Sequence, residues 1–434
     1  MKISGSLLKP LLATSLCALS LAFASAQHPV APSLSSNPGA QYTIFLNFSG
    51  FDYSGTWAGG TPGNVPAYTQ DGDATTFTTD EVNAIKETWA RVSQAYIGFN
   101  INVTTVDPAP SNLNDAQRKD YYDNTQYLTH TIIGGSYNWY GAAGGVSYVG
   151  VAQDPTTVNG MRTNWVFPAN GTGTTPKYMT AAIIHEDGHH LRLWHQSDEN
   201  NGGGYSSNNG AVGDGSYAPI MGVSYYSQRG TWRVGKAGVN DNDVAELQKN
   251  TNIGPLLDSG IGHSMATATA LAIATDGTVD SSLASGWIMP TAESGYSATS
   301  YTTDFFKFYS DGGPLSLTAH DGTQFLQEGV ADPGATMRSV LEILDINGTV
   351  VGTATEDAST LNHIWNGTLG TGEYYARVRS YGAYVSSYEP DSQYFNMGAY
   401  FLSGSGFSAV PEPATMVALL GGVGLLLKRR RKSA

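Results

Sequence analysis

The sequence predicts an α+β protein, in which a mixed, twisted sheet with helices is followed by an all-β sandwich. Three observations favour this architecture. A strand, helix and strand pattern opens the first part, a histidine-rich helix lies in its middle, and only strand patterns follow Pro255. A chain of 434 residues is also long enough to form more than one hydrophobic core.

The N-terminal segment has the three parts of a secretory signal peptide. Two lysines precede an apolar run that ends at Phe23, and the small residues 24–26 follow. We therefore expect residues 1–26 to be removed on export and residues 27–40 to form a linker. The only cysteine, Cys17, lies in the apolar run, so disulfides and thiolate metal sites are excluded from the mature chain.

The C-terminal end combines a short apolar segment with a basic stop. Pro411-Glu412-Pro413 precedes the apolar residues 414–427, and five basic residues follow. This tail, residues 410–434, resembles the PEP-CTERM sorting signal of Gram-negative bacteria. The resemblance implies an exosortase-type processing enzyme as a partner, transient membrane anchoring, and a final location outside the cell. The alternative is a stable tail anchor, although the apolar segment is shorter than the about 20 residues that usually span a membrane.

Composition also indicates an exported protein. The chain has 52 glycines and 25 tyrosines but only 13% charged residues, which is typical of β-rich, loop-rich secreted proteins. Its formal net charge is −14, and removal of the two basic ends makes the body more acidic still. This charge argues against nucleic acids and anionic lipid surfaces as partners.

The first domain, residues 41–255, is expected to open with a strand, a helix and a second strand. Apolar residues alternate from Tyr42 to Phe48, which predicts a half-buried strand. Thr78 and Glu81 form a capping box that starts a helix running to about Gly98. Its apolar face recurs at spacings of three and four: Val82, Ile85, Trp89, Val92 and Tyr96. The following strand returns beside the first through this helical crossover.

The stretch HEDGHHLRLWH, which begins at His185, carries the chemistry of a metal site. On a helix from residue 178 to 193, His185 and His189 lie one turn apart on one face, with Glu186 beside them. Two neutral imidazoles suit Zn²⁺, and His195 supplies a third if the chain turns back after about Arg192. Three protein ligands leave a fourth position for water, and Glu186 is then the general base.

The spacing His-Glu-x-x-His with a third histidine six residues on resembles the metzincin zinc peptidases. Met221 follows His195 by 26 residues, where that family has a methionine turn beneath the metal. The resemblance implies a zinc endopeptidase with an active-site helix and a C-terminal helix, the latter expected from about Asn240. Tyr225 is a candidate oxyanion donor or movable ligand. Arg192 departs from the family pattern, which has glycine at this position. Glycine adopts the left-handed conformation of the turn freely, whereas this conformation costs other residues on the order of 1–2 kcal/mol.

The glycine-rich residues 141–152 are expected to form a strand. In the family this strand pairs with the extended substrate, which implies a substrate role for Val146, Ser147, Tyr148 and Val149. The alternative is a simple hairpin edge. His190 lies about 100° round the helix from His189, which places it either on the surface or behind the ligands. The stretches DGD at residues 71–73 and DND at residues 241–243 could bind Ca²⁺, but neither completes an EF-hand loop.

The second domain, residues 263–407, contains only strand patterns. Asn347-Gly348 between apolar alternations predicts a two-residue hairpin. The runs DFFKFYS, ILDINGTVV and GEYYARVRS resemble the pre-peptidase C-terminal domains appended to secreted bacterial proteases.

Together these features predict a secreted or surface-sorted zinc endopeptidase that acts on protein or peptide substrates. Two alternatives belong to other classes. One is a matrix or adhesion protein on a metzincin scaffold that binds zinc but turns over poorly, with Arg192 as its motivation. The other is a carbohydrate-binding protein in which the sandwich does the binding and the first domain is vestigial.

Overall fold

The computed structural model describes most of the chain between residues 28 and 408. The described segments are residues 28–152, 161–196, 217–233, 242–249, 253–254, 256–289, 303–322, 335–381 and 396–408. The predicted signal peptide and sorting tail lie outside them. Within these segments no helix is long and apolar enough to cross a membrane.

A five-stranded sheet forms the centre of the first unit, in the order β4-β1-β5-β7-β6. Four of its strands run parallel and β6 is antiparallel at one edge. Their bounds are β1 Tyr42–Asn47, β4 Ile101–Thr104, β5 Leu128–Ile133, β6 Gly145–Val146 and β7 Thr163–Val166. The predicted opening is confirmed, because β1 and β4 are parallel neighbours joined by a helical crossover.

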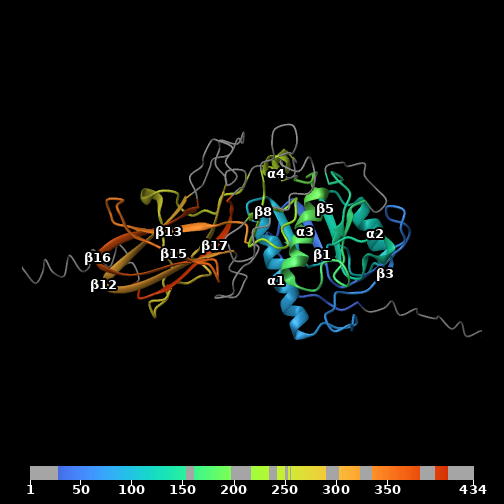
Figure 1. Cartoon of the computed structure of the whole chain (residues 1–434), viewed down its shortest axis with the longest axis horizontal. Helices are drawn as coiled ribbons and strands as arrows, with labels where there is room; N and C mark the ends of the chain where they lie inside the picture. The colour runs from blue at the N-terminus through green and yellow to red at the C-terminus, as the bar shows by residue number, and fades with distance from the viewer. Residues whose placement is uncertain are drawn as a thin grey trace, which may run out of the picture.

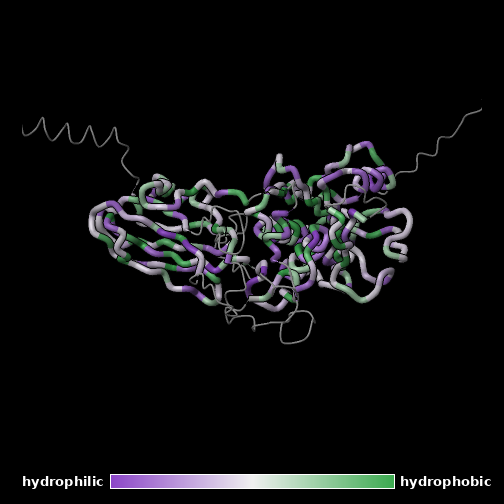
Figure 2. The backbone as a smooth tube through the Cα atoms, turned by 90° about the horizontal axis from the view of Figure 1, so that it is seen from above, coloured by the Kyte–Doolittle hydropathy of each residue, from purple (hydrophilic) through white to green (hydrophobic). Residues whose placement is uncertain are grey.

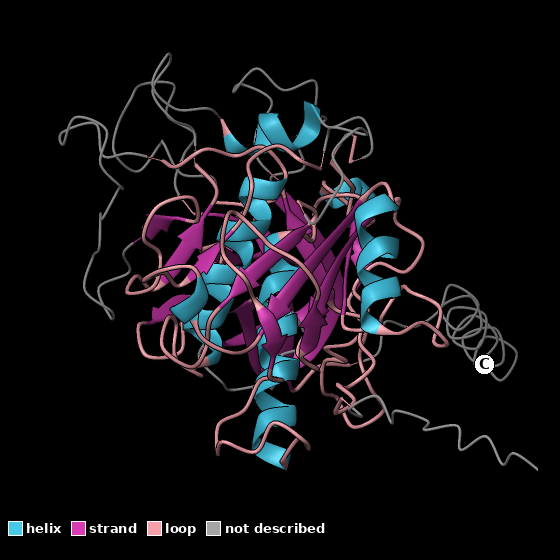
Figure 3. Ribbon diagram, turned by 90° about the vertical axis from the view of Figure 1, so that its right-hand side faces the viewer, coloured by secondary structure: helices cyan, strands magenta, loops and turns pink. Residues whose placement is uncertain are grey.

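Helices cover both faces of this sheet (Figures 1 and 3). The helices are α1 Thr79–Ala95, α2 Asp115–Asn124, α3 Pro176–His190 and α4 Asp243–Lys249. α1 and α3 pack on one face with Ile44 and Leu46, whereas Phe45 joins α2 and an aromatic cluster on the other. β1 is therefore buried on both faces, and the expectation of a half-buried strand is wrong, as is usual for a central parallel strand.

The predicted start of α1 is confirmed by its cap. Thr78 accepts a hydrogen bond from the Glu81 amide at 3.3 Å, and the Glu81 carboxylate accepts one from the Thr78 amide at 2.7 Å. The Trp89 indole donates to the Val103 carbonyl at 2.9 Å, which holds α1 against β4. α1 ends at Ala95, slightly before the predicted Gly98, and α4 begins at Asp243 rather than near Asn240.

Two small strand pairs complete this unit. β2 Phe51–Tyr53 and β3 Gly63–Val65 form an antiparallel hairpin over the aromatic cluster. β8 Tyr217–Pro219 and β9 Arg229–Thr231 run parallel. β8 lies on the side of the unit that faces the second unit (Figure 1).

The glycine-rich strand is much shorter than predicted. β6 contains only Gly145 and Val146, and the chain then leaves the sheet. The Gly150 amide donates to the His189 carbonyl at 2.9 Å, and the Ala152 amide donates to the His190 carbonyl at 3.1 Å. Since the last carbonyls of a helix lack partners within it, this segment caps α3 instead of extending the strand.

In its described segments the second unit consists of strands, as predicted, apart from one 3-10 turn at Met265–Thr267, and these strands form one hydrogen-bonded network. The strands are β10 Thr269–Ala270, β11 Ser285–Ile288, β12 Thr303–Asp321, β13 Ser339–Leu344, β14 Val350–Thr353, β15 Thr355–Asp357, β16 Asn362–Ser380 and β17 Gly398–Ser405. β12 and β16 pair along nearly their whole length, from Thr303 opposite Arg379 to Ala319 opposite His363. One half of this ladder is flanked by β10 and β13, and the other half by β17 and β15.

The long ladder changes its buried face halfway. Phe306 and Phe308 are buried in one half of β12, and Leu315 and Leu317 in the other, so the buried positions change from even to odd numbers. Gly312 lies between them with φ +92°, a conformation that favours glycine. Both halves thereby contribute to one apolar core. Figure 2 shows apolar segments in both units.

The predicted hairpin after β13 is present, but its loop has three residues. The Asp345 amide donates to the Thr349 carbonyl at 2.9 Å, and Gly348 has φ +80° while Asn347 has no positive φ. The Asp345 carboxylate also accepts the Asn347 and Thr349 amides at 2.8 and 2.9 Å. The two-residue prediction is wrong because this carboxylate and one left-handed glycine form a longer turn with a bulge.

His130 on β5 is a core histidine that the sequence pattern does not single out. Its ring is fully buried, stacks on Phe45 with centroids 5.5 Å apart, and lies 4.1 Å from the Tyr122 ring. Asn47 Nδ2 lies 3.1 Å from its Nε2. Burial lowers the pKa of His130 to about 3, so the folded protein holds this ring neutral.

We expect the free energy of unfolding to fall as the pH is lowered from about 6.5 toward 3. In this window the unfolded chain binds a proton at His130 that the folded chain does not, which costs on the order of 1 kcal/mol per pH unit. Urea unfolding between about pH 4 and 7 measures this, and His130→Gln should show a shallower slope.

His28→Gln is the control for this experiment. Asp115 lies 2.9 Å from His28 Nε2 and raises the pKa of His28. Its contribution therefore has the opposite sign: it is present at pH below about 6.5 and is lost as the pH rises through the folded pKa. An unchanged slope in His130→Gln would contradict the prediction.

Candidate metal centre

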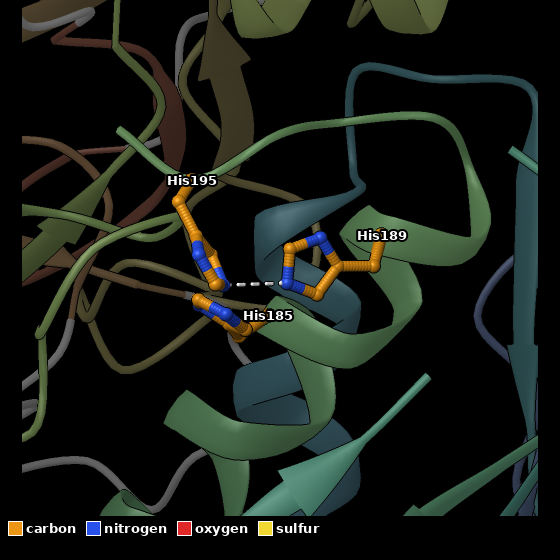
Figure 4. A group of neighbouring side chains, drawn as sticks. All are labelled: His185, His189 and His195. Carbon is orange, nitrogen blue, oxygen red and sulfur yellow. Dashed lines mark hydrogen bonds between the residues drawn. The ribbon is translucent and has the colours of Figure 1, made fainter. Parts of the chain in front are cut away.

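Three histidines bring their ring nitrogens together at the end of α3 (Figure 4). His185 and His189 come from successive turns of α3, and His195 returns to them from the following chain. One nitrogen of each ring lies within 4.8 Å of the other two, and the Nε2 atoms of His189 and His195 are 2.9 Å apart. His185 and His189 are buried, whereas His195 is exposed, so the group is accessible from one side.

Backbone carbonyls orient the two helical rings. His185 Nδ1 donates to the Ile220 carbonyl at 2.9 Å, and His189 Nδ1 donates to the Leu193 carbonyl at 2.8 Å. A carbonyl can only accept, so the proton of each neutral ring lies on Nδ1 and Nε2 keeps its lone pair. This is the arrangement in which imidazole binds a metal ion.

Desolvation keeps these rings neutral. Burial, with smaller effects of the neighbouring histidines, lowers the pKa of His185 to about 3. The His195 residue is exposed on one side but its ring is partly desolvated, and this desolvation, with a smaller effect of His189, lowers its pKa to about 4. Burial also lowers the pKa of His189. Three neutral imidazoles around one point fit Zn²⁺, because ligand nitrogens at about 2.0–2.1 Å from the ion lie about 3.4 Å from one another.

The turn predicted near Arg192 is present and has left-handed geometry. Arg192 has φ +81°. The Arg192 amide donates to the His189 carbonyl at 2.8 Å and the Leu193 amide to the Gly188 carbonyl at 2.8 Å, which together form a Schellman motif. Arg192 therefore occupies the position where glycine is preferred, and the chain turns there nonetheless.

The loop around Met221 supports the centre from below. Met221 is fully buried, and a Cβ atom added to Gly188 would lie 2.5 Å from its sulfur. The Met221 carbonyl accepts the Gln196 amide at 2.8 Å, next to His195. Gly188, between the two helical ligands, is thus the residue that lets Met221 approach α3 this closely.

Two supporting residues are missed by sequence reasoning. The Gln196 side chain donates to Asp243 Oδ1 at 2.8 Å, and Asp243 Oδ2 accepts the Arg233 amide at 2.9 Å. Asp243 is buried and holds the chain that follows His195. Its sequence suggested a helix start or a calcium ligand, and no local pattern indicates a contact 47 residues away.

The calcium hypothesis gains no support from the described residues. Asp71 and Asp73 accept hydrogen bonds within their own turn, from Thr69 and Thr75. The Asp243 carboxylate is engaged as described above, and Asp241 lies outside the described segments. In the part of the chain that the structure describes, the histidine triad is the one group of at least three His, Cys, Asp or Glu side chains close enough to hold an ion.

Glu186 follows His185 on α3, and its side chain lies against Gly145 of β6 at the edge of the sheet. The residue is 7% exposed, and burial, with a smaller effect of Asp187, raises the pKa of its carboxyl group well above the usual range. A Cβ atom added to Gly145 would lie 2.7 Å from Glu186 Cγ and 3.0 Å from Oε1. The glycine in β6 therefore makes room for this carboxyl group.

His190 is buried, which rules out the surface alternative. Its Nδ1 donates to Asn164 Oδ1 at 3.0 Å. Asp187 Oδ1 accepts Asn164 Nδ2 at 3.0 Å and the Thr131 hydroxyl at 2.6 Å. Burial raises the pKa of Asp187 to about 7. This network fixes the rear of α3 to β5 and β7, so that the opposite face presents the triad.

The remaining predicted residues surround β6. Val146 pairs with Trp165 in the sheet. The Ser147 hydroxyl donates to Asn164 Oδ1 at 2.7 Å, and the Tyr148 ring lies 4.7 Å from that of Trp57. Val149 is partly buried after the strand has ended. A Cβ atom added to Gly144 would lie 2.7 Å from the Tyr225 hydroxyl, so Tyr225 reaches the residue before β6.

Comparisons with known proteins add little to this geometry. No family model and no curated protein matches the chain. Among solved structures, it is similar to the pre-peptidase C-terminal domain of a collagenase from Bacillus anthracis, with 13% sequence identity and a TM-score of 0.18. The similarity covers 30% of this chain and 89% of that domain. A similarity this weak carries no argument about the fold or the function of this chain.

We expect His195→Ala to lose tight zinc binding, because two imidazoles on one helix face leave the ion short of a protein ligand. Zinc content after dialysis against a weak chelator measures this. His190→Gln is the control, since its ring binds Asn164 and lies behind the helix. Equal zinc content in His195→Ala and the wild type would place the third ligand elsewhere.

We expect Arg192→Gly to retain zinc and to raise the free energy of unfolding by about 1 kcal/mol. Glycine adopts a left-handed conformation without the penalty that Arg192 carries, although it gains entropy in the unfolded chain. Arg192→Val should lower stability, because β-branched residues tolerate positive φ poorly. Thermal and urea unfolding compare the three proteins, and a stabilising valine would contradict the argument.

Proposed function

We propose that the protein is a secreted or surface-sorted zinc-dependent endopeptidase that hydrolyses protein or peptide substrates. The observation that carries the proposal is the convergence of three neutral imidazoles on one point, with Glu186 on the adjacent residue of the helix. The exposed side of His195 supports an approach of substrate from outside. The metzincin resemblance of the motif agrees with this geometry.

The zinc ion, when bound to the three imidazoles, would polarise a carbonyl group and lower the pKa of water. Glu186 accepts a proton from the attacking water and later delivers it to the leaving amine. Its buried setting favours this role, because a carboxylate with a raised pKa holds a proton more readily. Gly145 keeps the carboxyl group close to the strand edge where the peptide would lie.

The edge of the sheet supports an extended peptide as substrate. Among the described strands, β6 pairs with β7 alone, which leaves its other side for an added strand. Gly145 and Val146 would pair with the peptide backbone, while Ser147, Tyr148 and Val149 line its path beyond the strand. Tyr225, whose hydroxyl lies against Gly144, is the candidate donor to the developing oxyanion.

The proposal also includes export and processing of the tail by an exosortase-type enzyme, and it includes no nucleic acid partner. Their support comes from the terminal sequences and the acidic composition. The alternative of a zinc-binding but weakly active adhesion protein had Arg192 as its motivation. The left-handed turn at Arg192, which brings His195 back toward His185 and His189, supports the peptidase over this alternative.

We expect Glu186→Gln to lose peptide cleavage by about 10²–10⁴-fold while it keeps its zinc, because the amide cannot accept the proton of water. Cleavage of a quenched peptide mixture and of a denatured protein, with zinc content measured in parallel, tests this. Glu373→Gln, an exposed change in β16, is the control. Equal background cleavage by the wild type and Glu186→Gln, both with zinc bound, would reject the peptidase.

A further inference from the structure

A buried ion pair joins the two units of the molecule. Arg229, in β9 of the first unit, is fully buried. Its Nη2 lies 2.9 Å from Asp321 Oδ2, at the end of β12, and 3.2 Å from Glu356 Oε1, in β15. Its Nε donates to the Met337 carbonyl at 3.1 Å. All three partners belong to the β unit.

Both carboxylate oxygens of Asp321 have hydrogen-bond partners. Its Oδ1 accepts the Ser339 amide at 3.1 Å, while Oδ2 faces Arg229. The side chains of Arg229 and Asp321 are both 0% exposed. A guanidinium group taken fully out of water is strongly unfavourable without a paired carboxylate, so the position of β9 depends on the β unit.

β9 in turn carries the loop that orients the metal ligands. β8 and β9 are parallel partners, and the Ile220 amide, directly after β8, donates to the Thr231 carbonyl at 2.9 Å. The Ile220 carbonyl is the group that accepts His185 Nδ1. The next carbonyl, of Met221, holds the Gln196 amide beside His195. His185 and Gln196, the residue after His195, thus both bind carbonyls of the loop that follows β8. β8 in turn pairs with β9, the strand that Arg229 anchors.

We infer that contacts with the β unit hold the metal ligands in place, and that Asp321 and Arg229 are positioning residues for His185 and His195. The inference rests on the proposed metal centre. The pair holds β9, and the Thr231 carbonyl of β9 binds the Ile220 amide. The Ile220 carbonyl orients the His185 ring, and the Met221 carbonyl binds the Gln196 amide next to His195. Removing the charge of Asp321 lets this segment relax and weakens zinc binding, although no zinc ligand is changed.

The test measures the dissociation constant for Zn²⁺ of the full chain, by competition with a chromophoric chelator near neutral pH. We expect Asp321→Asn to weaken zinc binding by about fivefold or more, a coupling of ordinary size between distant sites. Glu342→Gln is the matched control. Glu342 pairs with Arg377 at 2.6 Å and Arg379 at 3.1 Å, all within the β unit. It should lower stability without changing zinc affinity.

Every outcome either supports or overturns the inference. Equal zinc affinity of the wild type and Asp321→Asn overturns it, and so does equal weakening in Glu342→Gln, because the effect would then be general destabilisation. If Asp321→Asn does not fold, Glu356→Gln takes its place, with about a twofold weakening expected and an unchanged affinity counting against the inference. A wild-type chain that binds no zinc rejects the proposed metal centre itself, which distinguishes the two failures.

Discussion

The abrupt end of α3 is the constraint on which the rest of the site depends. A helix that continued past Leu191 would carry the third histidine away from the first two. The Schellman motif centred on Arg192 reverses the chain instead, and the same motif places the Leu193 carbonyl where it orients His189. This geometry requires a left-handed φ of +81° at Arg192, and the packing of the surrounding domain offsets the conformational free energy that it costs.

Around that turn, main-chain groups do most of the positioning. The carbonyls of Ile220 and Leu193 set the tautomers of two ligands, and the amides of Gly150 and Ala152 cap the carbonyls at the end of the helix. These contacts give buried polar groups of the ligands and of the helix end their hydrogen-bond partners. The orientation of the ligand rings thus depends on main-chain groups that are themselves fixed by the fold.

Glycines adjust the distances between these layers. Gly188 admits the Met221 sulfur against α3, and Gly145 admits the Glu186 carboxyl under β6. In both cases a single methyl group would enter a neighbouring side chain. The sequence shows the glycines plainly, but their reason lies in residues far away along the chain, so a pattern search assigns them only to a motif or a strand.

The sequence by itself determined the local features: the capping box at Thr78, the alternation along β1, the crossover to β4 and the spacing that places His185 and His189 on one helix face. These follow from periodicity and short-range hydrogen bonds, which neighbouring residues decide. The tertiary structure alone decided the early end of β6, the burial of His130 and His190, the contact between Gln196 and Asp243, and the dependence of β9 on the β unit. Each of these arises because a buried polar group must find its partner across the fold, and a sequence does not show which distant group will be near enough to provide it.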